Sequence, residues 1–252
     1  MPSGEKRVAL VTGASYGIGA ATAVALARDG YDVAVSELRV EDLSDTLDRI
    51  AAVGRRAAPV ELDVRSMRSI EQATGDVISA LGRVDVLVNN AGVTLRRLAV
   101  DVTPDEWNEV INVNLKGTFF MSQQVARHLV AAGRSGCIIN IASMHGMLAF
   151  TQRSAYGISK AGVIHMTKML SYEWVNHRIR VNAVAPGTVE TRTRAAYFRD
   201  HPQARKAMME RIPVHRFGTP EEVAAAVCYL AGPAADYITG QTLSLDGGLS
   251  SY

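Results

Sequence analysis

The sequence predicts an α/β fold, with one domain built on a doubly wound parallel sheet of about seven strands and helices on both faces. Short apolar runs, mostly β-branched, alternate with segments long enough for helices, which gives a repeated β-α-β order. A glycine-rich turn follows the first run, where such a sheet places its ligand. The length of 252 residues, with 48% hydrophobic and 21% charged, fits one large domain with a substantial core.

Each predicted strand is short and bounded by turn residues. The runs are continuously apolar rather than alternating, which is typical of strands buried on both faces of a parallel sheet. Right-handed crossovers between such strands produce the doubly wound arrangement. The expected strands cover residues 8–11, 32–35, 58–61, 84–88, 137–141, 180–184 and 242–245.

Two helix starts are marked by capping boxes, in which a threonine and a glutamate three residues later satisfy free backbone N–H groups. Thr103 pairs with Glu106 and Thr219 with Glu222, and each box has proline at the first helical position. We interpret both boxes as structural.

Residues 190–216 break the alternation, because this stretch is polar and rich in arginine. It follows the sixth strand and is expected over the carboxyl ends of the strands, where open α/β sheets bind ligands. It is therefore a candidate substrate lid within the single domain of residues 1–252. An ordinary pair of surface helices is the alternative.

Charge and cysteine content exclude several classes of protein. A net charge of +2 is too small to indicate a nucleic-acid or acidic-membrane partner. Cys137 and Cys228 form no disulfide or metal-binding pattern, so we expect two buried thiols and no metal site. Residues 1–6 contain no signal-type apolar stretch, and no run reaches membrane-spanning length. We therefore expect a cytoplasmic protein that acts on small molecules.

The turn between the first strand and the next helix reads Thr12-Gly13-Ala14-Ser15-Tyr16-Gly17-Ile18-Gly19. Glycine lets the backbone turn sharply and approach a pyrophosphate closely. Free N–H groups at the following helix start then bind the anion. The sequence thus predicts a dinucleotide site at this turn.

Glu37 ends the second strand and indicates which dinucleotide is bound. A carboxylate there can accept hydrogen bonds from both adenosine ribose hydroxyls and repels a 2′-phosphate, which favours NAD over NADP. Tyr16 precedes the second glycine and Leu38 follows the acid, and neither carries a positive charge that would attract a 2′-phosphate. Arg39 is near enough to reach a phosphate, so NADP remains the alternative.

Tyr156 and Lys160 are four residues apart and share one face of a predicted helix. A nearby ammonium favours tyrosinate, so we expect Lys160 to lower the pKa of Tyr156 towards the range of a general acid/base. Ser143 follows the fifth strand, and its hydroxyl can donate to a substrate oxygen and hold it beside the tyrosine.

The glycine turn, Ser143 and the Tyr156/Lys160 pair together resemble the classical branch of the short-chain dehydrogenase/reductase family, from Lys6 to the C-terminus. The resemblance implies a Rossmann-type fold and direct hydride transfer between nicotinamide and an alcohol or ketone, without a metal. It implies that Asn114 is a fourth catalytic residue, which holds a water linked to the lysine. It also implies a homotetramer, paired through the helices after Pro104 and Tyr156 and, at a second interface, through the last strand and the C-terminal tail. The sequence leaves open whether Tyr252 reaches a neighbouring subunit's active site.

The same resemblance extends the cofactor site. It implies that Asp63 contacts adenine, that the Asn89-Asn90-Ala91-Gly92 turn lies against the cofactor, and that the Pro186-Gly187-Thr188 stretch holds the carboxamide. The expected cofactor residues are Gly13, Ser15, Tyr16, Gly17, Ile18, Gly19, Glu37, Leu38, Asp63, Val64, Asn90, Ala91, Gly92, Tyr156, Lys160, Pro186, Gly187, Thr188, Val189 and Thr191.

Residues beside the catalytic set and in the candidate lid are expected to face the substrate. They are Thr94, Met144, His145, Phe150, Arg153, Glu190, Arg192 and Tyr197, with Leu95, Arg96, Arg97, Gln152 and Phe198 as further candidates. The excess of arginine favours an anionic or polyhydroxy substrate, such as a sugar, polyol or hydroxy acid. Solvated surface arginines are the alternative.

The sequence therefore predicts an NAD(H)-dependent oxidoreductase acting on a polar secondary alcohol or ketone. An NADPH-dependent 3-oxoacyl-(acyl-carrier-protein) reductase is the enzymatic alternative, because the overall pattern is also similar to those members. A dinucleotide-sensing protein without catalysis is the alternative from another class, and the intact Ser143/Tyr156/Lys160/Asn114 set argues against it.

Overall fold

The computed structural model describes residues 6–251, and its seven strands form one parallel sheet in the order β3-β2-β1-β4-β5-β6-β7. All seven expected strands are present, with ends shifted by at most two residues. They are β1 (Val8–Thr12), β2 (Asp32–Glu37), β3 (Ala57–Glu61), β4 (Val86–Asn89), β5 (Gly136–Ile141), β6 (Ile179–Pro186) and β7 (Thr242–Leu245).

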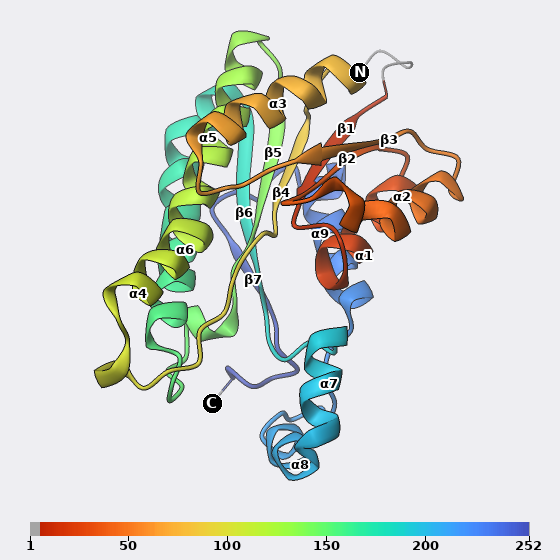
Figure 1. Cartoon of the computed structure of the whole chain (residues 1–252). Helices are drawn as coiled ribbons and strands as arrows, with labels where there is room; N and C mark the ends of the chain where they lie inside the picture. The colour runs from red at the N-terminus through yellow and green to blue at the C-terminus, as the bar shows by residue number, and fades with distance from the viewer. Residues whose placement is uncertain (1–5, 252) are drawn as a thin grey trace.

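Helices cover both faces of the sheet, as predicted (Figure 1). One face carries α3 (Met67–Leu81), α4 (Pro104–Ile111), α5 (Thr118–Ala131) and α6 (Ser154–Trp174). The other carries α1 (Gly17–Arg28), α2 (Ser44–Ala51) and α9 (Pro220–Ala231). The sequence prediction of a doubly wound α/β fold is confirmed.

In the central strands of the sheet, alternate residues enter two separate hydrophobic cores. In β1, Val8 and Leu10 join the core beneath α3, α5 and α6, whereas Ala9 and Val11 join the core beneath α1 and α9. All four side chains are fully buried. Burial on both faces explains why the strands read as continuous apolar runs.

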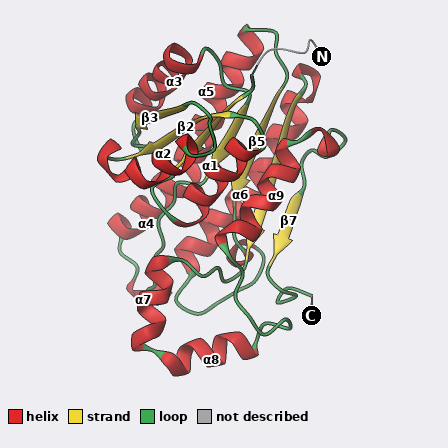
Figure 2. Cartoon of the chain, turned by 90° about the vertical axis from the view of Figure 1, so that its right-hand side faces the viewer, coloured by secondary structure: helices red, strands yellow, loops and turns green. Residues whose placement is uncertain are grey.

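The strand order reverses between β1 and β4, and this switch point is where doubly wound sheets bind dinucleotides. The glycine turn leads from β1 into α1 at that point. Helices α7 (Arg192–Asp200) and α8 (Pro202–Glu210) project beyond the carboxyl ends of the strands (Figures 1 and 2). Residues 190–216 thus contain a helix pair at the carboxyl edge of the sheet, and their role as a substrate lid stays a prediction.

The helix pair has a small hydrophobic core of its own. Phe198, Ile212 and Phe217 are buried together, with Met208 and Met209 packed against them. Phe198, a further substrate candidate, therefore lies inside this core, which corrects that expectation. We predicted that Phe198 faces the substrate because the sequence did not reveal that it packs against Ile212 and Phe217.

Several smaller expectations can be checked against the fold. Both capping boxes form at the starts of α4 and α9. Both cysteines are free; Cys137 is buried, but Cys228 is only partly buried. Within residues 6–251, no helix combines the length and apolar character needed to span a bilayer. The expectations for the first five residues and for Tyr252 fall outside the described range.

Candidate active site

The fold brings Ser143, Tyr156 and Lys160 together. Ser143 follows β5 and begins a short helical turn, while Tyr156 and Lys160 lie in the first half of α6. The Ser143 hydroxyl lies close enough to Tyr156 to lower the pKa of the phenol. The Lys160 ammonium lies 5.9 Å from the centre of the Tyr156 ring. The spacing of these residues in the sequence therefore corresponds to a real cluster.

The electrostatic state of the cluster differs from the sequence expectation. Burial raises the pKa of Tyr156, and the Ser143 hydroxyl and the charges of Arg194 and Arg153 oppose this rise only in part. Burial also lowers the pKa of Lys160 to about 8. The Lys160 Nζ donates to the Ile141 carbonyl at 2.7 Å. The expected lowering of the Tyr156 pKa by Lys160 is thus not found in the protein alone, because desolvation dominates both groups.

Asn114 lies in a π-helical segment, Asn112–Gly117, between α4 and α5. Its side chain is fully buried and hydrogen-bonded. The amide accepts from Val93 N at 2.8 Å and donates to Val93 O at 2.9 Å and to Ser159 Oγ at 3.1 Å. The side chain therefore ties the loop after β4 to α6 beside Lys160. π-Helical insertions are frequent at functional sites, and no sequence signal used above revealed this one.

The glycine turn is shaped for close approach by a ligand. Gly13 and Gly17 have φ values of +63° and +60°, which strongly favour glycine. Asn90 Nδ2 donates to Thr12 O at 3.0 Å and to Gly13 O at 2.7 Å. Helix α1 begins without a side-chain cap or an acidic residue in its first turn, so its N–H groups are available to an anion. These features fit a dinucleotide phosphate.

Glu37 lies beside this turn. Ser15 Oγ donates to one carboxylate oxygen at 2.6 Å, and Leu38 N donates to the other at 3.0 Å. Arg39 forms a forked ion pair with Asp42, with its Nε at 3.1 Å and its Nη2 at 2.9 Å from the carboxylate. Tyr16 and Leu38 are both 54% exposed. The Glu37 carboxylate therefore lies beside the glycine turn, where the ribose of a dinucleotide is expected. The Arg39 guanidinium, which could attract a 2′-phosphate, is already paired with Asp42.

The adenine-side and nicotinamide-side residues have structural partners of their own. The hydrogen bond from Arg65 holds the pKa of Asp63 below its usual range, and Val64 is buried. Gly92 passes close to Lys160, since a Cβ at this position would lie 3.6 Å from Nζ. After β6, Gly187 approaches Asp246, and Thr188 and Val189 are buried. Thr191 caps α7 and lies near Gly17.

The substrate candidates separate into two groups. His145 lies between Phe150 and Tyr156, with ring-centre distances of 4.6 Å and 5.6 Å, and its Nδ1 is 3.2 Å from Ser143 Oγ. Arg153 precedes α6 and donates to Leu95 O at 3.2 Å. These residues surround the tyrosine.

The remaining candidates lie at the periphery or are engaged elsewhere. Met144 is buried, whereas Thr94 and Arg192 are exposed. Glu190 pairs with Arg205 at 3.5 Å, and Arg97 pairs with Glu106. Tyr197 and Gln152 both accept hydrogen bonds from Arg96, each at 2.8 Å.

Arg194 is a site residue that the sequence reasoning missed. It lies in the first turn of α7, and its charge acts on both Tyr156 and His145. The residue nominated instead, Arg192, is exposed. Arg194 is three residues after Thr191 and therefore on the same helix face as a residue beside the glycine turn. A predicted helix start at Thr191 would have identified it.

The fold and this site define a class of protein: an oxidoreductase with a dinucleotide-binding turn and a Ser/Tyr/Lys set. A family model described as enoyl-(acyl carrier protein) reductase matches residues 13–250. The chain belongs to the short-chain dehydrogenase/reductase family, whose members act on alcohols and ketones. Among the described residues, no group of three His, Cys, Asp or Glu side chains is arranged for a metal.

Three relatives illustrate the range of the family. The 2-dehydro-3-deoxy-D-gluconate 5-dehydrogenase of Escherichia coli is 36% identical over 97% of this chain and 95% of its own length. The 3-oxoacyl-(acyl-carrier-protein) reductase FabG of Thermotoga maritima is 40% identical, over 97% and 98%. A solved structure of a putative 2-deoxy-D-gluconate 3-dehydrogenase from Agrobacterium tumefaciens, with bound NADP, has 40% identity and a TM-score of 0.90, covering 98% of both chains.

Proposed function

We propose that this protein is an NAD(H)-dependent enzyme that interconverts a secondary alcohol and a ketone on a polar substrate, such as a sugar, a polyol or a hydroxy acid. The observation that carries the proposal is the Ser143/Tyr156/Lys160 cluster beside a glycine turn whose neighbouring acid is Glu37. The similarity to a sugar-acid dehydrogenase supports the substrate class.

In this proposal each catalytic side chain has a defined role. A bound nicotinamide supplies or accepts the hydride. The Ser143 hydroxyl donates to the substrate oxygen and orients it. The Tyr156 phenol exchanges a proton with the same oxygen. Lys160, whose pKa burial lowers to about 8, holds a proton near Tyr156, and Asn114 fixes the surrounding backbone and, by resemblance, a water linked to the lysine.

The preference for NAD is supported by electrostatics at Glu37. A 2′-phosphate near this carboxylate would meet a like charge, and Arg39 is already paired with Asp42. The NADP bound to the Agrobacterium protein shows that a relative of this similarity can take the other cofactor.

Parallel fluorescence titrations of NADH and NADPH test this preference. We expect NADH to bind about fivefold more tightly, because one unfavourable charge contact costs roughly 1 kcal/mol at such a partly exposed site. The variant Glu37→Gln should narrow the ratio, whereas Arg39→Ala should leave it unchanged. Tighter NADPH binding by the unmodified protein would overturn the assignment of Glu37 and direct attention to Arg39.

A 3-oxoacyl-(acyl-carrier-protein) reductase is the second candidate, because the Thermotoga reductase matches this chain over almost its whole length. NADPH-dependent reduction of acetoacetyl thioesters, faster than any NAD-dependent alcohol oxidation, would place this candidate first.

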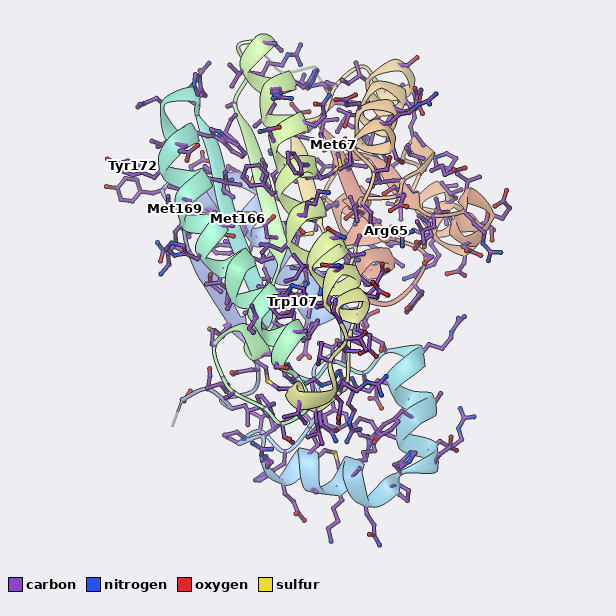
Figure 3. The ribbon with its side chains drawn as sticks, turned by 60° about the vertical axis from the view of Figure 1, so that its left-hand side comes forward. Arg65, Met67, Trp107, Met166, Met169 and Tyr172 are labelled. Carbon is purple, nitrogen blue, oxygen red and sulfur yellow. The ribbon has the colours of Figure 1, made fainter. Side chains whose placement is uncertain are left out.

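We also propose a homotetramer in which α4 and α6 contribute one interface. Trp107, Met169 and Tyr172 are 38%, 51% and 85% exposed on this side of the molecule (Figure 3). They flank a hollow of about 350 Å³ lined by Ile111, Leu115, Lys116, Phe119, Phe120 and Met166. Exposed apolar surface of this kind marks protein–protein contacts. Light scattering at micromolar concentration should give four times the chain mass, and a monomer would contradict the proposal.

A further inference from the structure

Two arginines beside the catalytic tyrosine have no carboxylate partner among the described residues. Among the residues that the structure describes, Arg153 donates to the Leu95 carbonyl alone, and the Arg194 guanidinium has no hydrogen-bonding or ion-pair partner. Both side chains are partly buried. Other arginines of the same region are paired with acids, namely Arg97 with Glu106, Arg205 with Glu190 and Arg216 with Glu222. The positive charge next to the reacting position is therefore uncompensated by the protein.

The two arginines approach from different elements. Arg153 immediately precedes α6, three residues before Tyr156, and its Nη1 is fixed 3.2 Å from Leu95 O in the loop after β4. Arg194 is in the first turn of α7, where its backbone N–H donates to the Thr191 hydroxyl. The start of α7 also lies against the glycine turn, since a Cβ on Gly17 would be 3.5 Å from Thr191 Cγ2.

The two guanidiniums share an electrostatic environment with Tyr156 and His145. Burial lowers the pKa of Arg194, and repulsion from Arg153 adds to this effect. Burial likewise lowers the pKa of Arg153, with a further contribution from Arg96. Both charges act on Tyr156 and His145. Partly desolvated like charges are costly unless a ligand of opposite charge compensates them, so such a pair marks a functional site.

We infer that Arg153 and Arg194 form an anion subsite that binds a carboxylate or sulfonate of the substrate and so presents its carbinol carbon at Tyr156. This inference rests on the proposed function and narrows its substrate class to hydroxy acids and their sulfonate counterparts. Guanidinium groups suit these ligands because their N–H groups match two acceptor oxygens in one plane.

The cofactor pyrophosphate is the rival occupant of this subsite. It is expected at the uncapped start of α1, where backbone N–H groups are available. Arg153 belongs instead to the segment that enters α6 and is held by the loop after β4, on the side of the catalytic tyrosine. A substrate anion therefore explains the presence of both Arg153 and Arg194 near Tyr156 better than the cofactor pyrophosphate does.

The first test measures anion binding without requiring turnover. Thermal unfolding is followed with and without 100 mM sulfate for the unmodified protein and for Arg153→Met, Arg194→Met and Arg199→Met. Sulfate stabilises most proteins generally, so the exposed Arg199 in the last turn of α7 is the matched control. The unmodified protein and the control should gain about 2–4 °C more than the other two variants. Equal gains in all four proteins would overturn the subsite.

The second test compares matched substrates that differ only in charge. Gluconate and gluconamide, and 3-hydroxybutyrate and its amide, are assayed with NAD within a wider panel of neutral secondary alcohols. Arg153→Met and Arg194→Met should lower kcat/KM for the acids by roughly ten- to a hundredfold more than for the neutral alcohols, which lose only the effect of the two charges on the Tyr156 pKa. Arg194→Lys, which keeps the charge and loses the fork, should fall between. Equal losses on acids and neutral alcohols would overturn the inference.

Two further outcomes separate this inference from the proposed function. If no alcohol of the panel is oxidised, the proposed function fails, and the sulfate measurement still decides whether the subsite exists. If the arginine variants weaken NADH binding as much as they weaken acid turnover, the arginines bind the cofactor, and the inference is overturned while the proposed function stands.

Discussion

The cofactor side and the substrate side of this active site are built differently. On the cofactor side, Asn90 Nδ2 donates to the Thr12 and Gly13 carbonyls, and Glu37 is hydrogen-bonded to Ser15. On the substrate side, Arg153 and Arg194 are desolvated and lack acidic partners among the described residues. The first arrangement fixes a shape shared by relatives with different substrates. The second leaves two partly buried positive charges, which in our proposal an anionic substrate compensates.

The largest expected effect lies where the two sides meet. Tyr156→Phe removes the phenolic proton donor and should lower kcat by roughly 10²–10⁴-fold. NADH affinity and the melting temperature should change little, because the ring remains. Steady-state kinetics and fluorescence titration measure the two quantities. A variant that keeps more than a tenth of the activity would show that another group transfers the proton.

A clash on the cofactor side should produce the next largest effect. A Cβ on Gly19 would overlap the Gly13 carbonyl oxygen and lie 2.6 Å from Asn90 Nδ2. Gly19→Ala should therefore lower the free energy of unfolding by about 3 kcal/mol, the upper part of the usual range for overpacking, and weaken NADH binding.

Gly75 provides the matched control for that variant. It lies in α3, and a Cβ there meets nothing within 4 Å. Gly75→Ala should raise the free energy of unfolding by about 1 kcal/mol, because alanine is the better helix former. Denaturant titrations of both variants decide the point. Equal effects would mean that the glycine turn is not a rigid frame.

The pH dependence of the free energy of unfolding tests the substrate side. Burial, followed by the charges of Arg153 and Arg194, lowers the pKa of His145 from 6.5 to about 4. As pH falls below 6.5 the unfolded chain takes up this proton first, so stability declines by roughly 2 kcal/mol at pH 5.

The variant His145→Gln lacks this titration and isolates it from the carboxylates. Its free energy of unfolding should fall less than that of the unmodified protein between pH 7 and pH 5, and the two curves should run parallel above pH 7. Parallel curves over the whole range would contradict a buried neutral imidazole at this position.

The two sides also differ in how well the sequence predicts them. The strands, the glycine turn and the Ser143/Tyr156/Lys160 set could be predicted from local sequence patterns. In a parallel sheet, a given spacing along the chain places residues at a defined position. The predicted lowering of the Tyr156 pKa was wrong, because burial raises it and a four-residue spacing does not reveal burial. The π-helical segment around Asn114 was missed because one extra residue per turn leaves no change in composition.

The region around α7 was predicted as a location but not residue by residue. The sequence placed residues 190–216 over the ligand-binding edge, yet nominated Arg192 and Phe198 rather than Arg194. Which arginine faces inward depends on where α7 starts, and a shift of one or two residues turns a different side chain towards the site.

The smallest expected effect tests whether α7 is held in place from the substrate side. Arg96 is exposed and donates to Tyr197 Oη on α7 and to Gln152 Oε1 before α6, each at 2.8 Å. Arg96→Ala should change the free energy of unfolding by less than about 1 kcal/mol, because exposed hydrogen bonds contribute little. It should nevertheless raise KM several-fold and speed proteolysis within residues 190–216.

Arg97→Ala is the control for this variant, because the neighbouring Arg97 pairs with Glu106 on α4 and not with α7. If Arg96→Ala changes KM and proteolysis while Arg97→Ala changes neither, the position of α7 depends on a few polar contacts, in contrast to the hydrogen-bonded turn at Gly13. If the two variants behave alike, the hydrophobic core around Phe198 alone positions α7, and the substrate side is as rigid a frame as the cofactor side.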